Sequence, residues 1–142
     1  MSDAHDLSLA QPMGAQECLD LLQKKAKVGR VGFVAHGHPM ILPVNYQADD
    51  SSVVFRTSEG TSLSLLGGAR VAFEVDSYDA STHSGWSVLV HGVAQEVTGT
   101  EELTRLRRGR LQSWGRRDVE EGDHWVRIPI EDVTGRRIGE VR

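Results

Sequence analysis

The feature that most constrains this chain is a change in hydrophobic period near residue 30, from a helical repeat to the alternation of β-strands. From there, short apolar runs are separated by turns rich in glycine, proline, serine and aspartate. The expected strands are RVGFVAH, MILPVNYQA, VVFRT, RVAFEVDS, GWSVLVHGVAQEV and HWVRIPI, followed by a short closing strand. The pattern predicts a mainly β fold: an antiparallel β-barrel, closed or nearly closed, with flanking helices.

Two segments keep the helical period. Apolar residues recur at helical spacing between Ala15 and Val28, which predicts a helix there with Gly29 as its left-handed cap. A second helix is expected to begin at Thr100, and Glu101 is expected to pair with Arg105 one turn later. The polar residues 1–14 are interpreted as a loose N-terminal arm, and residues 15–142 as a single domain.

Composition limits the classes of partner. The chain has 142 residues, of which 39% are hydrophobic, and a formal net charge of −4. One domain with its own core is expected, and the acidic total argues against a surface built for nucleic acid or anionic lipid. The basic run RLRRGR, with Trp114 nearby, could bind nucleic acid, but we interpret its charges as complements to the helix dipole.

Compartment and metal binding are constrained by a few residues. The single cysteine, Cys18, excludes an internal disulfide and fits a reducing cytoplasm, and no apolar run is long enough for a membrane span. The histidines lack the spacing of metal ligands, so no metal site is expected. Trp125, with the alternating apolar residues after it, is expected in the core or at an interface.

Pro43 sits inside the second expected strand. Because proline cannot donate a ladder hydrogen bond, this stretch is predicted to lie on an edge or at a bulge, with backbone groups exposed nearby.

The stretch RTSEGTSL, residues 56–63, follows an apolar strand and combines one cation with four hydroxyls and a glycine. Arg56, the hydroxyls after it and the start of a short helix at Thr61 would form a phosphate cradle, and Gly60 would allow close backbone approach. The structural alternative is that Ser58 caps the short helix while Arg56 pairs with Glu59 or Glu74.

Taken in order, these motifs from about residue 15 to residue 138 resemble the flavin-binding split β-barrel family typified by pyridoxamine 5′-phosphate oxidase. The similarity favours the branch with nitroimidazole-reductase-like and uncharacterised actinobacterial members. The resemblance implies FMN at the interface of a homodimer and a flavin-dependent oxidoreductase that passes hydride or electrons to a small-molecule acceptor. It assigns no catalytic side chain.

The resemblance also implies a set of cofactor-binding residues. The ring wall is implied to be Pro43, Val44, Asn45 and Tyr46. The phosphate ligands are implied to be Arg56, Thr57, Ser58 and Thr61, with Gly60 in the same turn. Trp86 is implied to lie near the flavin or the dimer contact. Ser62 stands where related sequences often carry a lysine, which removes a cation from the site.

Three other functions stay open at this stage. One is a non-catalytic protein that binds flavin, haem or a deazaflavin. A second keeps the enzyme but replaces FMN with the deazaflavin coenzyme. The third is a structural dimer with a degenerate site. Because a flavin carries the redox chemistry itself, no Ser/His/Asp triad is needed, and none is evident.

Overall fold

The structure is a computed structural model that describes residues 10–24, 28–58, 66–108 and 123–139. Its described strands form one nine-stranded antiparallel sheet in the order β1-β9-β6-β5-β2-β3-β4-β8-β7. The strands are β1 Gln11–Pro12, β2 Val28–Ala35, β3 His38–Ala48, β4 Ser52–Thr57, β5 Arg70–Asp79, β6 Ser84–Val93, β7 Gln95–Glu96, β8 His124–Pro129 and β9 Asp132–Ile138. The helices are α2 Ala15–Lys24 and α3 Thr100–Arg108. The mainly β prediction is confirmed, but the sheet is not closed into a ring, because β1 and β7 remain its two ends.

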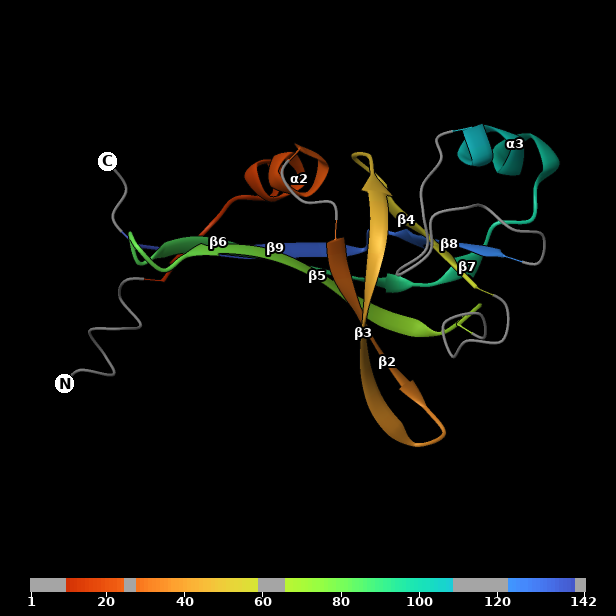
Figure 1. Cartoon of the computed structure of the whole chain (residues 1–142), viewed down its shortest axis with the longest axis horizontal. Helices are drawn as coiled ribbons and strands as arrows, with labels where there is room; N and C mark the ends of the chain where they lie inside the picture. The colour runs from red at the N-terminus through yellow and green to blue at the C-terminus, as the bar shows by residue number, and fades with distance from the viewer. Residues whose placement is uncertain (1–9, 25–27, 59–65, 109–122, 140–142) are drawn as a thin grey trace.

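The two helices lie at opposite ends of the sheet (Figure 1). α2 lies over β6 and β9, where Arg137 of β9 forms an ion pair with Glu17 of the helix. α3 lies beside β7 and β8, where Arg127 of β8 pairs with Glu102. Each helix therefore forms one ion pair with an arginine of the sheet, in addition to its buried apolar contacts.

The hairpin of β2 and β3 projects away from the rest of the sheet (Figure 1). Ala35 pairs with His38, so the turn consists of His36 and Gly37, both with positive φ (52° and 78°). Two central residues in the left-handed region are typical of the type I′ turn, whose twist matches that of the paired strands. Both hairpin histidines, His36 and His38, are exposed, as their place beside a turn predicts.

The core has two clusters of unequal size, separated by β4. Val53 and Phe55 belong to the large cluster inside the curved sheet, whereas Val54 faces a small cluster with Trp125 and Leu106. Because side chains alternate along a strand, Arg56 is directed to the same side as Val54. Every residue of β4 is buried, so its polar end is buried as well.

The first helix is shorter than the sequence pattern predicts. It ends at Lys24, and Val28 is already part of β2. The prediction that Gly29 caps this helix is wrong, because Gly29 pairs with Val44 within the sheet. A Cβ there would lie 2.3 Å from the ring of Phe73, so close packing requires this glycine. The expected pair between Glu101 and Arg105 is also wrong, because Arg105 pairs with Glu102.

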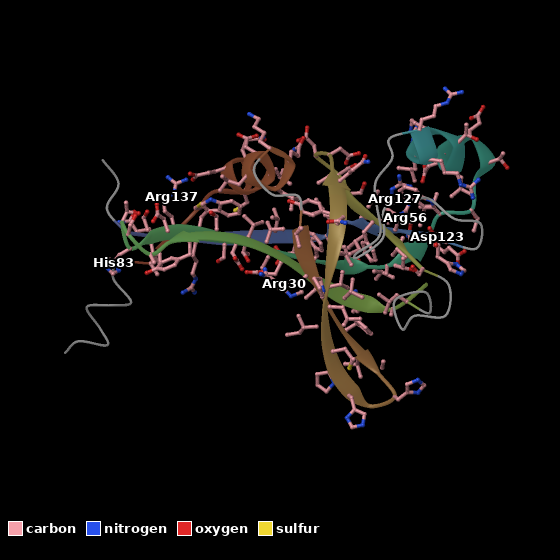
Figure 2. All side chains as sticks on the ribbon, viewed as in Figure 1. Arg30, Arg56, His83, Asp123, Arg127 and Arg137 are labelled. Atoms are coloured by element: carbon pink, nitrogen blue, oxygen red, sulfur yellow. The ribbon has the colours of Figure 1, made fainter. Side chains whose placement is uncertain are left out.

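The outer face of the sheet carries an acidic pair beside one cation. Nη1 of Arg30 on β2 lies 3.2 Å from both Glu74 and Asp76 of β5 (Figure 2). Desolvation, together with a hydrogen bond and repulsion from Asp76, raises the pKa of Glu74 to about 7, although Arg30 opposes the shift.

Replacing Gly29 with alanine should destabilise the fold by about 1–3 kcal/mol, because Phe73 is fully buried and cannot move aside freely. Gly32→Ala in the same strand is the matched control, since the nearest atom to its added Cβ is 3.8 Å away. Urea unfolding monitored by circular dichroism gives both free energies of unfolding. Equal values for the two variants would contradict the packing argument.

The raised pKa of Glu74 predicts that the free energy of unfolding falls as pH rises from 4.5 to about 7. Over that range the folded protein keeps a proton that the unfolded chain releases, so the contribution is complete below pH 4.5. Because the carboxyl is partly exposed, we expect a loss of about 1 kcal/mol. Denaturant unfolding across this range should show less pH dependence in Glu74→Gln, whereas the exposed control Glu131→Gln should keep it.

Candidate functional site

β3 and β4 are paired over only part of their length. Their pairing ends at Tyr46 and Phe55, and beyond this point β2 is the single neighbour of β3 among the described strands. Pro43 pairs with Arg30 of β2 on one side, so the prediction that it lies on an edge is confirmed for the part of the chain described. We call residues 43–45 of β3, residues 56–57 of β4 and the following Ser58 the split, because the two strands separate there.

The split brings the implied ring wall next to the implied phosphate ligands, but the wall residues alternate between two environments. Val44 and Tyr46 are buried in the large cluster. The Tyr46 hydroxyl donates a 2.7 Å hydrogen bond to the carbonyl of Leu22, and burial raises the pKa of Tyr46 above its ordinary value. Pro43 and Asn45 are only half-buried, so theirs are the wall side chains that reach the outer face.

Arg56 is the most deeply placed charge at the split. The residue is 1% exposed, its Nε lies 3.3 Å from Oδ2 of Asp123, and its guanidinium lies 6.0 Å from the ring centroid of Trp125. Figure 2 shows Arg56 and Asp123 together at the β4–β8 end of the molecule. A buried charge needs a partner of opposite sign, and Asp123 provides it. The alternative pairing of Arg56 with Glu59 lies outside the described residues, and Glu74 instead pairs with Arg30.

Two buried polar atoms beside Arg56 lack hydrogen-bond partners within the described parts of the chain. These are the hydroxyl of Thr57, a residue only 3% exposed, and Nε1 of Trp125, a residue 1% exposed. A buried polar group without a partner is costly and is a common feature of ligand sites. Either donor can serve an anion, and the Thr57 hydroxyl lies at the end of β4, next in the chain to the Arg56 cation, so the split offers a donor and a cation to a negatively charged group.

The other implied ligands are distributed differently. Gly60, Thr61 and Ser62 lie outside the described residues, as does the short helix expected from Thr61. Trp86 lies on β6, four strands from β4 in the sheet order, and packs against the large cluster. Within one chain, the structure therefore does not bring Trp86 to the split.

A cavity of about 330 Å³ adjoins the split on the side of α3. We call it the β8–α3 cavity; its lining includes Glu96, Val97, Thr98, Leu103, Arg107, Asp123, His124 and Trp125. Nδ1 of His124 lies 3.2 Å from the Glu96 carboxylate. Sequence reasoning missed Asp123 at this site, because nothing near it in the sequence indicates that β8 pairs with β4.

Neither a metal-binding cluster nor a membrane-spanning helix occurs in the described segments. They contain no group of three or more histidine, cysteine, aspartate or glutamate side chains that could hold a metal ion. Nor is any helix within them long and apolar enough to cross a membrane.

Comparison with known proteins gives relatives that span nearly the whole chain. The uncharacterized protein Rv0080 of Mycobacterium tuberculosis is 34% identical, and the alignment covers 91% of each chain. The FAD binding protein of Mycobacterium smegmatis is 35% identical with a TM-score of 0.73, covering 91% of this chain and 98% of that one.

Two further findings define the fold and the family. A structure from Bacteroides thetaiotaomicron, named for 5-nitroimidazole antibiotic resistance, aligns with a TM-score of 0.72 over 92% of this chain and 88% of its own. At 12% identity this likeness shows the fold alone. The family model for pyridoxamine 5′-phosphate oxidase matches residues 14–137, and the chain therefore belongs to that family.

Proposed function

We propose that this chain binds a flavin nucleotide at the split and uses it to pass hydride or electrons to a small-molecule acceptor. The observation that carries the proposal is the buried Arg56 beside the Thr57 hydroxyl, which has no hydrogen-bond partner within the described residues. Membership of the family and the FAD bound by the Mycobacterium smegmatis relative support a flavin as the ligand.

The residues at the split fit the phosphate end of such a ligand. A phosphate needs at least one cation and several donors, and charge-assisted hydrogen bonds are the strongest that a protein can offer it. Arg56 supplies the cation, and the Thr57 and Ser58 hydroxyls supply donors at the end of β4. Gly60, Thr61 and Ser62 follow in the sequence after Glu59 and remain predicted ligands.

The edge of β3 suits the flat ring of the same ligand. Pro43 has no backbone N–H to donate, and no described strand pairs with residues 43–45 on the side away from β2. A ring can therefore lie along the backbone near Asn45. A bound flavin supplies the redox chemistry. The task of the chain is to hold the phosphate, orient the ring and leave one ring face open to the acceptor.

Thr57→Val tests the proposal because valine keeps the shape of the side chain but removes the unpartnered hydroxyl. We expect flavin affinity to fall about tenfold or more, while the free energy of unfolding without ligand stays equal or rises. Fluorescence titration with FMN, FAD and the deazaflavin coenzyme measures the affinity, with Thr134→Val on exposed β9 as the control.

Two results of that titration would decide against the proposal. If none of the three coenzymes binds at tens of micromolar, the chain is not a flavin protein. If Thr57→Val binds as tightly as the unaltered chain, the phosphate lies elsewhere. Sustained turnover with a reduced nicotinamide donor would separate an oxidoreductase from a protein that only stores flavin.

We also propose that the functional unit is a homodimer. Val34 and Ile41 on the projecting hairpin are 68% and 72% exposed, and an open groove of about 400 Å³ lies beside them over Gly32 and Ala72. Large apolar side chains gathered on an exposed face are typical of protein–protein contacts. A second copy could cover this face by two-fold symmetry.

Ile41→Arg should shift the chain from dimer to monomer, because it places a charge within the apolar face. Sedimentation velocity measures the distribution, and His38→Arg at the exposed hairpin end is the matched control. An unaltered chain that sediments as a monomer at tens of micromolar would overturn the dimer proposal.

A further inference from the structure

We propose that the β8–α3 cavity receives the adenylate half of FAD, so that this chain prefers the dinucleotide to FMN. The inference rests on the proposed function, because it extends the same ligand beyond its first phosphate. It concerns residues that neither the family resemblance nor the sequence pattern assigned to the cofactor.

The position of the cavity supports this extension. Asp123 and Trp125 line it, and the same two residues contact Arg56 at the split. A phosphate held by Arg56 would therefore lie at the border of the cavity. FMN ends at that phosphate, whereas FAD continues with a second phosphate, a ribose and an adenine.

The size and lining of the cavity fit those additional groups. Its volume of about 330 Å³ lies within the range of small-molecule sites. Val97 and Leu103 provide apolar surface for the faces of a purine. The carboxylate of Glu96, beside His124, can accept hydrogen bonds from ribose hydroxyls or from the adenine amino group.

The charges around the cavity also favour a second phosphate. Arg107 of α3 lines the cavity and has no carboxylate partner among the residues described, whereas Arg105 of the same helix pairs with Glu102. FAD carries a second phosphate group that FMN lacks, and a cation in the cavity can contact that group, whereas Ser62 does not supply the lysine that related sequences often have. Arg107 can provide that cation from the lining of the cavity.

The buried indole of Trp125, which adjoins both the split and the cavity, also points to a ligand. Its buried Nε1–H lacks an acceptor in the described structure, and the residue lines the cavity. Phosphate, ribose and adenine all carry acceptors that could satisfy this donor. A buried N–H without an acceptor costs free energy, and a ligand in the cavity would remove that cost by accepting a hydrogen bond from the indole.

The experiment compares FAD and FMN binding in the full-length chain by fluorescence and calorimetric titration. Arg107→Glu should weaken FAD binding about tenfold and change FMN binding less than twofold. Arg108→Glu is the matched control, because it makes the same charge change in the same exposed last turn of α3 but does not line the cavity. Thr98→Trp, which fills the cavity from an exposed position, should have the same selective effect as Arg107→Glu.

Selective loss of FAD affinity in Arg107→Glu and Thr98→Trp supports the inference. Equal losses of FAD affinity in Arg107→Glu and Arg108→Glu would show that only the net charge of the helix matters, and would overturn the inference. An unaltered chain that binds FMN as tightly as FAD would also overturn it but leave the proposed function intact. Failure to bind any flavin would overturn both.

Discussion

The buried ion pair of Arg56 and Asp123 is the interaction on which the arrangement of this site depends. A guanidinium taken out of water is costly unless a carboxylate and further contacts compensate it, and here the compensation comes from β8. The pair fixes the end of β4 against the start of β8, just where β3 separates from β4. The split and the β8–α3 cavity are therefore held in place by the same two side chains.

The small cluster around Trp125 gives that pair its low-dielectric surroundings. Val97, Leu106 and Trp125 pack against Val54 on one side of β4, while the large cluster covers the other side. Arg127 of β8 pairs with Glu102 of α3, so the helix that lines the cavity is tied to the strand that directly follows Asp123. A shift of α3 relative to β8 would therefore alter both the environment of Arg56 and the shape of the cavity.

Much of the fold could be predicted because its signals are local. Alternating apolar residues identified the strands, and Pro43 marked the edge from its missing N–H alone. Gly29 was misassigned because a glycine after a helical repeat usually caps the helix, whereas here its role is set by Phe73 on another strand. The family resemblance likewise implies that Tyr46 lines the flavin ring, whereas in the structure its hydroxyl donates a hydrogen bond to Leu22 of α2 within the core. Such contacts between distant segments leave no local pattern.

The charge balance at the split explains why Arg56 alone is a weak basis for binding an anion. With Asp123 beside it, the pair carries no net charge, so a phosphate there would gain donors but meet a carboxylate as well. Ser62 adds no positive charge in the turn that follows. A cation outside β4 would then strengthen the binding of a ligand whose phosphates extend beyond the split. Arg107, which lines the adjoining cavity, can supply that cation to a second phosphate, which links the lysine that Ser62 replaces to the choice between a mononucleotide and a dinucleotide.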